Sequence, residues 1–252
     1  MKSIRMEEMT WPAIRAAIEG GCTTAVVAVG ATEQHGPHLP TMTDARIGDA
    51  VAALVAQKLG GALVATTVDV GFSEHHLAFG GTISLKPETL KLVLRDYADS
   101  LVRCGFTRIV FVPTHGGNFP AVNEAIREAR AAHPGVVVTG YTDLLGFAGY
   151  LNRVSAEYGV GAEASGAHAG ENETSMMMAL EPGLVDPGRF AAGYLGPLGG
   201  AEVKRILERG MPDLTSNGVL GDPGGASAEK GRVYLERLAD FLVAQVGAKD
   251  AV

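Results

Sequence analysis

Residues 24–44 read TAVVAVGATEQHGPHLPTMTD and carry the main sequence signals for the fold. Its first six residues form a short continuous apolar run, which is typical of a β-strand buried on both faces of a sheet. The next residues are dense in glycine and proline, which break helices and strands, so we expect a loop. Asp44 then opens a segment with the apolar spacing of a helix, whose start favours an anion. The stretch predicts a strand–loop–helix unit.

The same unit recurs along the chain. Further strands are expected at residues 62–68, 108–113 and 136–141, and helices at 45–59, 87–104 and 119–133. Strands that alternate with helices predict an α/β fold, with a mostly parallel sheet and helices on both faces. Later helices are expected over 142–158, through the apolar MMMAL, over 202–210 and over 226–247. Because no linker or repeat interrupts the pattern, we expect a single domain over residues 1–252.

Composition limits the class of protein. The chain has 252 residues and a formal net charge of −7, and its Lys and Arg residues form no cluster, which argues against nucleic acid or an anionic membrane as partner. No stretch approaches the roughly 18 apolar residues of a membrane helix. Cys22 and Cys104 are expected to be buried thiols in a reducing compartment. We therefore expect a cytoplasmic protein.

Polar residues follow the predicted strands in a regular way. In open parallel sheets, ligands bind at the carboxyl ends of the strands, so side chains in these loops should converge on one cleft. Carboxylates and imidazoles together are ligands that zinc, manganese or iron accepts. The residues concerned are Glu33, His35, His38 and Asp44 around the first loop, Glu74, His75 and His76 after the second strand, His115 after the third, and His168, Glu171 and Glu173 after the fourth.

Several of these residues have alternative interpretations. In THGGN, His115 can point into the cleft while Gly116 and Gly117 let the backbone approach a ligand, or the segment is only a tight turn. Glu173 is either a ligand or a residue that complements the helix dipole. Adjacent His75 and His76 point in opposite directions if the chain is extended, so at most one should reach the site.

At this point the motifs resemble a known family. GATEQHGPHLPTMTD, SEHHLAFGGTISL, THGGN and HAGENETS, in this order, are similar to motifs of the creatininase (creatinine amidohydrolase) family. The resemblance implies two divalent metal ions per chain (zinc, manganese or iron), hydrolysis of a non-peptide or cyclic C–N bond of a small-molecule amide, and often a hexamer. It also implies that Glu33, His35, Asp44 and His115 are ligands, with Asp44 bridging, and that His168 is catalytic.

The chain departs from the creatininase pattern at two points. Creatininases proper have a ligating glutamate where this chain has Gly117, so another carboxylate must complete the second metal site; Glu173 is preferred and Glu171 is the rival. Creatininases also place tryptophans over the substrate, whereas the single tryptophan here, Trp11, precedes every motif. The Gly-Gly form resembles branches that include the mycofactocin-system peptidase and formamide deformylases. Residues that could contact substrate or support the ligands are His38, His75, His76, Gly116, Gly117, Asn118 and Glu171.

The resulting hypothesis is a metal-dependent amidohydrolase in which metal-activated water attacks an amide. A second hypothesis is a phosphoester hydrolase, because two-metal sites also catalyse phosphoester hydrolysis. A third is a non-catalytic metal-binding scaffold. Substrate specificity is expected to lie in residues 142–167 and 186–200, which contain no recognisable motif.

Overall fold

The computed structural model describes residues 3–247 and contains one parallel sheet in that range. The strand order is β2-β1-β3-β4, with β1 (Thr24–Val29), β2 (Ala62–Val64), β3 (Arg108–Pro113) and β4 (Val137–Gly140). Alternate residues of β1 point to opposite faces: Val26 and Ala28 join one core cluster and Val27 joins the other. The strands are buried on both faces, as the apolar run at residues 24–29 predicts.

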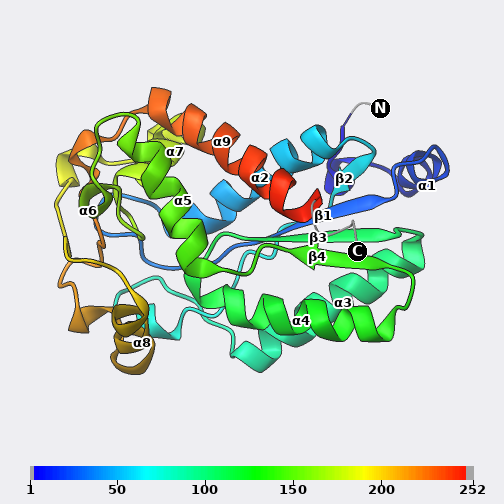
Figure 1. The fold of residues 1–252 in the computed structure, drawn as a ribbon, viewed down its shortest axis with the longest axis horizontal. Helices are drawn as coiled ribbons and strands as arrows, with labels where there is room; N and C mark the ends of the chain where they lie inside the picture. Colours follow the sequence, from blue (N-terminus) through cyan, green and yellow to red (C-terminus); the bar gives the residue numbers. More distant parts are fainter. Residues whose placement is uncertain (1–2, 248–252) are drawn as a thin grey trace.

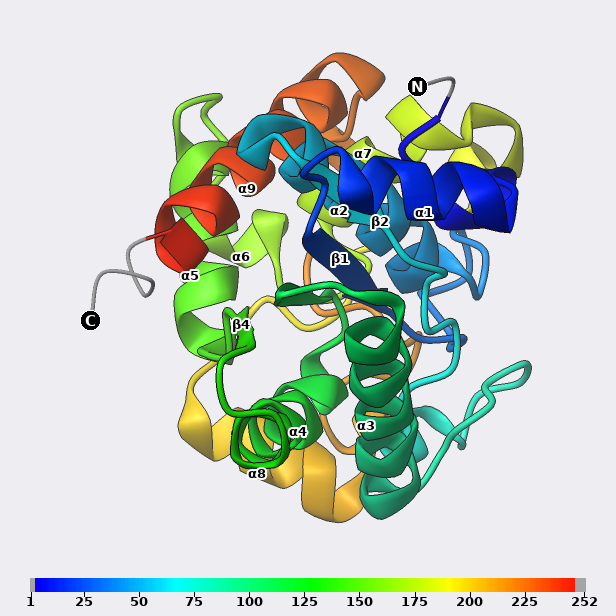
Figure 2. The same cartoon turned by 90° about the vertical axis from the view of Figure 1, so that its right-hand side faces the viewer.

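Helices cover both faces of the sheet (Figures 1 and 2). One layer contains α2 (Thr43–Leu59), α5 (Leu144–Ala156), α7 (Glu171–Leu180) and α9 (Ala228–Gly247). The opposite layer contains α3 (Pro87–Cys104) and α4 (Phe119–Ala132), with α1 (Trp11–Glu19) packed at its edge. The short helices α6 (Ala162–Ser165) and α8 (Gly200–Arg209) lie at the end of the molecule opposite α1 (Figure 1). The predicted α/β architecture is confirmed.

The strand order defines where a ligand can bind. In the sheet, β1 lies between β2 and β3, so the chain moves from β1 to the neighbour on one side and later returns to the neighbour on the other side. The loops after β1 and β3 therefore separate toward opposite faces, which creates a crevice at the carboxyl ends of these two strands. Both loops carry predicted site residues.

Two expectations are corrected by the structure. The second strand was expected over residues 62–68, but β2 ends at Val64, and Val68 pairs with Val29 only as an isolated bridge. β2 lies at the edge of the sheet, where a departure from regular strand geometry disrupts few strand-to-strand hydrogen bonds. The expectation of two buried thiols is wrong for Cys104, which is exposed at the end of α3, beyond the last buried position, Leu101, while Cys22 is half-buried.

None of the helices found in residues 3–247 combines the length and the apolar character that crossing a bilayer requires.

Candidate metal centre

The loop after β1 turns sharply against the start of α2. A Cβ added at Gly30 would lie 2.5 Å from the Cα of Ala45, so only glycine lets the chain pass here. This close approach brings the loop and the first turn of α2 together, and both face the loop after β3. Glu33, His35 and Asp44 are consequently buried together beneath the carboxyl ends of β1 and β3.

The first half of the cluster consists of Glu33, Asp44 and His115. His115 Nδ1 lies 3.1 Å from Glu33 Oε1 and 3.2 Å from Asp44 Oδ2. The second half consists of His35, Asp44 and Glu173, where His35 Nε2 lies 3.2 Å from Asp44 Oδ1 and 3.8 Å from Glu173 Oε2. Asp44 thus presents one oxygen to each half.

Main-chain carbonyls fix the orientation of both imidazoles. His115 Nε2 lies 2.8 Å from the carbonyl oxygen of Phe72, and His35 Nδ1 lies 3.1 Å from that of Glu33. A carbonyl oxygen only accepts, so these nitrogens carry hydrogen, and in a neutral ring the other nitrogen is an acceptor. That acceptor faces carboxylate oxygens, which is favourable only when a cation, either a proton or a metal ion, lies between them. Ligating histidines typically donate their remote N–H in this way.

The charge balance agrees with this arrangement. Burial alone would lower the pKa of His35, but the Asp44 carboxylate and its neighbours raise it to about 10. Burial opposes the charged form of His115 too, yet Glu33 and Asp44 raise its pKa well above the ordinary value. Burial raises the pKa of Glu173 to about 7, with the Asp44 charge as a further cause. The carboxylates of the site therefore stabilise a positive charge placed between them, at His35 and at His115.

The residues present fit a metal ion. Within the described chain, both oxygens of Glu33 and Oδ2 of Asp44 are buried without a hydrogen-bond partner. Two ligand atoms of one tetrahedral zinc lie about 3.3 Å apart when each bond is about 2.0–2.1 Å, close to the imidazole–carboxylate distances above. Glu33, His35 and Asp44 form one group able to hold an ion, and His35, His168 and Glu173 form another.

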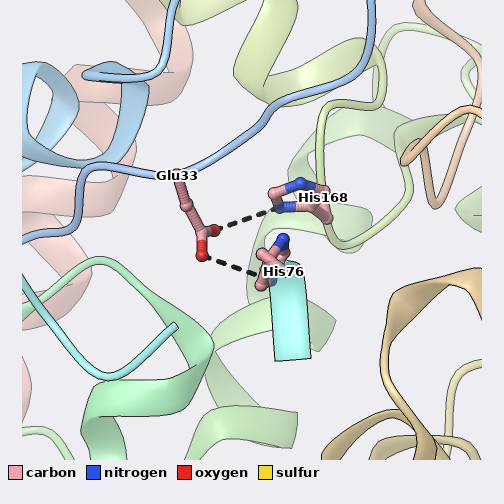
Figure 3. Close-up of side chains that lie close together, drawn as sticks. All are labelled: Glu33, His76 and His168. Carbon is pink, nitrogen blue, oxygen red and sulfur yellow. Dashed lines mark ion pairs between the residues drawn. The ribbon is translucent and has the colours of Figure 1, made fainter. Parts of the chain in front are cut away.

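His76 and His168 also point toward the Glu33 carboxylate, each near one of its oxygens (Figure 3). His76 Nε2 lies 3.2 Å from Glu33 Oε2, and His168 Nδ1 lies 3.6 Å from Glu33 Oε1. Burial lowers the pKa of both histidines well below the ordinary value, and the neighbouring imidazoles, His168 for His76 and His35 for His168, lower it further. Both rings are therefore neutral near pH 7.

Gln34, which sequence reasoning passed over, holds these two rings. Its Oε1 accepts from the N–H of Gly36, which fixes the amide so that Nε2 donates to His76 Nδ1 at 2.9 Å. The main-chain carbonyl of Gln34 lies 2.8 Å from His168 Nε2, so that nitrogen carries hydrogen and Nδ1 remains an acceptor directed at the cluster. The position of Gln34 between two predicted ligands was the available signal.

The expectation that at most one of His75 and His76 reaches the site is wrong. The segment is a 3₁₀ turn (Glu74–His76) rather than an extended strand, so successive side chains diverge by about 120° instead of 180°. His75 stacks on His115 with ring centroids 5.6 Å apart and an interplanar angle of 11°. Burial and the His115 charge lower the pKa of His75 to about 3.

Other predicted residues lie outside the cluster. Glu171 turns away to Lys230, with Oε1 2.8 Å from Lys230 Nζ. His38 contacts the Thr174 hydroxyl at 3.0 Å, and Asn118 ties the loops together by donating to the carbonyl of Gly30. A Cβ at Gly117 would lie 2.1 Å from the Phe72 carbonyl oxygen, so no carboxylate side chain fits there without rearrangement. Of the two glutamates considered for the second half-site, Glu173 is the one that approaches His35.

A cavity of about 330 Å³ opens from the cluster. Asp44, His115, His168 and Glu173 form part of its wall, and Gly116 and Gly117 lie beside them. Residues between 142 and 167 line it as expected, but from the range 186–200 only Leu198 does, and α8 supplies side chains that were not foreseen. Trp11 is 70% exposed on α1 and does not line the cavity. Among the described residues, therefore, no tryptophan covers this site.

Comparison with known proteins identifies the family. The sequence profile of the creatininase family, described as creatinine amidohydrolase, matches residues 7–246. The chain belongs to the creatininase family. It is therefore a hydrolase of the creatininase family, and its histidine and carboxylate cluster lies where the four motifs meet.

Individual relatives of this creatininase-family chain differ in the substrate that their names give. A mycofactocin precursor peptide peptidase of Mycobacterium ulcerans is 35% identical over 246 residues, covering 94% of this chain and 85% of that protein. Creatinine amidohydrolase of Pseudomonas putida is 31% identical over 247 residues, covering 93% of each. A solved creatininase mutant described as Zn-Zn type superposes with a TM-score of 0.79 at 27% identity, with 100% of both chains covered.

Proposed function

We propose that this protein is an amidohydrolase with two divalent metal ions per chain. The observation that carries the proposal is Asp44, whose two oxygens face two different imidazoles, each of which has a further carboxylate. Glu33, Asp44 and His115 would hold one ion, and His35, Asp44 and Glu173 the other. Zinc, manganese and iron all accept this mixture of nitrogen and oxygen ligands.

Bound divalent ions supply two effects, a bound water that ionises near neutral pH and polarisation of the substrate carbonyl. The protein's own residues supply proton transfer and orientation. His168 holds its Nε2 hydrogen against the Gln34 carbonyl, so Nδ1 is free to take a proton near the cluster and deliver it to the leaving nitrogen. Gln34 holds the His76 ring beside Glu33, with His76 Nε2 3.2 Å from Glu33 Oε2.

The substrate proposal follows from the relatives and the shape of the site. One relative is named for a peptide and another for creatinine, so we propose that the substrate is an amide bond of a short peptide or of a small linear or cyclic amide. The net charge of −7 supports the proposal that nucleic acid and anionic membranes are not partners. We also propose that the protein is a homo-oligomer, with a hexamer as the expected form, and light scattering would test this.

The deciding experiment measures metal content by mass spectrometry on protein purified without added metal, and hydrolysis of a panel of formamides, lactams and blocked dipeptides. We expect close to two ions per chain and turnover of at least one amide class. Asp44→Ala should lose both ions and all turnover. Asp49→Ala is the matched control: Asp49 lies on the same helix, is paired with Arg5 at a partly exposed position, and its loss should leave the two ions and the turnover unchanged. Substoichiometric metal that is indifferent to Asp44 would contradict the proposal.

A further inference from the structure

The cavity beside the metal centre has a wall that metal binding does not require. This wall comes from α5 and α8, helices separated by more than forty residues in the sequence. We propose that it forms a specificity pocket for an uncharged apolar group, aromatic or branched aliphatic, carried by the substrate next to the hydrolysed amide. The inference rests on the proposed function, because it names the substrate class of the same site.

Both helices present apolar side chains to the cavity. From α5 come Leu144, Phe147 and Leu151. From α8 come Val203 and Ile206, spaced three residues apart on one face of the helix. The intervening residues of α8 are charged and lie on the solvent side. An apolar group placed between α5 and α8 would therefore contact hydrocarbon on two sides.

Charge supports the same occupant. Among the described residues that line this cavity there is no lysine or arginine, and its two carboxylates, Asp44 and Glu173, belong to the metal centre. A charged side group would lose its hydration on entry without gaining a partner, which is costly. A free carboxylate or phosphate would lack a counter-ion along this wall. The cavity therefore selects for an uncharged group.

Exposed leucines mark the mouth of the cavity. Leu145 is 46% exposed and Leu207 is 47% exposed, and both line the cavity. A second cavity of about 500 Å³ shares Leu145 and Leu198 with the first and continues toward Tyr194. The combined space exceeds what a single small ring requires and lies within the usual range for ligand sites, about 300–1,000 Å³. A substrate that extends beyond its apolar group would cover the exposed leucines.

The test compares blocked dipeptide amides in which one residue is varied, first on the acyl side and then on the amine side of the central amide. The variable residue is Phe, Leu, Gly, Asp or Lys, and the metal-loaded enzyme is used. In one of the two series, Phe and Leu should exceed Gly in kcat/KM by about 10- to 100-fold, the effect expected when a large apolar side chain is buried. Asp and Lys should be no better than Gly.

Leu207→Lys is the diagnostic variant, because this leucine is half exposed and its replacement should leave folding intact. The variant should lose about 10-fold or more of the preference for Phe over Gly, gain relative activity toward Asp, and keep its metal content. Leu92→Lys is the matched control: Leu92 is 53% exposed on α3 and does not line the cavity. The control should behave as the unaltered protein.

The outcomes separate this inference from the proposed function. Hydrolysis of both series without preference for Phe or Leu would overturn the inference while the amidohydrolase stands. If no peptide is cleaved, calorimetric binding of N-acetylphenylalanine amide and N-acetylglycine amide to the metal-loaded protein decides. Tighter binding of the phenylalanine compound that Leu207→Lys abolishes would support the pocket even though the proposed activity had failed. Equal binding of the two compounds would overturn it.

Discussion

Two glutamates lie on α7, two residues apart, and their negative charges are balanced in different ways: Glu171 is buried, whereas Glu173 is partly exposed. Glu171 accepts from Ser175 Oγ at 2.8 Å and Tyr234 OH at 3.0 Å, and Lys230 Nζ lies at 2.8 Å. Glu173 points to the other side, toward His35. One glutamate has a permanent cation from the chain itself, and the other shares its site with further carboxylates.

The difference shows why the second site requires a cation from outside. Within residues 3–247, the ion-pair partners found for Glu33, Asp44 and Glu173 are all histidines. An imidazole is cationic only when it is protonated, whereas lysine is charged throughout the neutral range. Gathering two buried carboxylates and a third that is largely buried, without a fixed positive charge, is costly unless protons or metal ions compensate. The Glu171 carboxylate is fully compensated by residues of the chain and stabilises the fold. The cluster around Glu33, Asp44 and Glu173 is instead suited to metal binding.

The largest expected effect is a difference in metal content between variants of these two glutamates. Glu173→Ala removes the second carboxylate of one half-site, so metal content should fall from about two ions to about one and turnover should drop to background. Glu171→Ala removes a carboxylate of equal charge from the same helix and should retain both ions when assayed below its melting temperature. Metal analysis and the amide assay measure both. Equal metal loss in the two variants would show that α7 geometry, rather than ligation, is responsible.

His168 provides the next effect in size. Alanine at this position removes the Nδ1 acceptor that faces the cluster but no ligand of the two proposed half-sites. We expect kcat to fall by about 10²–10⁴, the usual contribution of general acid–base catalysis, with metal content unchanged. Loss of an ion in His168→Ala would instead assign this residue to ligation, and unchanged kcat would remove it from the mechanism.

Much of this site could be predicted from the sequence. Apolar runs such as residues 24–29 identify buried strands, and parallel topology places the following loops at one edge of the sheet. Glu33, His35, Asp44 and His115 are accordingly close together in the structure. Glu173 was preferred over Glu171 from motif resemblance, and the structure places Glu173 alone of the two beside His35. Its ligand role, like that of the others, stays a prediction until metal is measured.

What could not be predicted depends on local backbone geometry and on contacts distant in sequence. The 3₁₀ turn at Glu74–His76 has no clear sequence signature, and it decides that both histidines face the site. Gln34 acquires its role only because residues 76 and 168 meet around it. The α8 wall was missed because a helix of ordinary amphipathic pattern gives no indication of which cavity its apolar face will line.

A smaller effect concerns stability. Glu171→Ala leaves Lys230 partly buried without its carboxylate, and losing one partner of such a pair costs on the order of 3 kcal/mol. For a chain of this size that corresponds to a fall in Tm of roughly 6–12 °C. The double variant Glu171→Leu with Lys230→Met should recover most of the loss, since it removes both charges. Thermal unfolding followed by circular dichroism measures this, and a double variant no more stable than the single would contradict the ion-pair account.

The smallest effect is a proton count. Burial favours neutral His35, yet Asp44 raises its pKa to about 10, and the pKa of His115 is also raised, so both rings are protonated at pH 7.5 before metal binds. Metal ligation requires neutral imidazole, so each ring must release its proton, and apparent affinity should rise with pH until about pH 10. Burial keeps His168 and His76 neutral, and they release none. Zinc titrations in buffers of different ionisation enthalpy should therefore report about two protons released, plus a fraction from Glu173, whose pKa burial raises to about 7. Release near zero would contradict metal binding at His35 and His115, because both rings must lose a proton before they can ligate an ion.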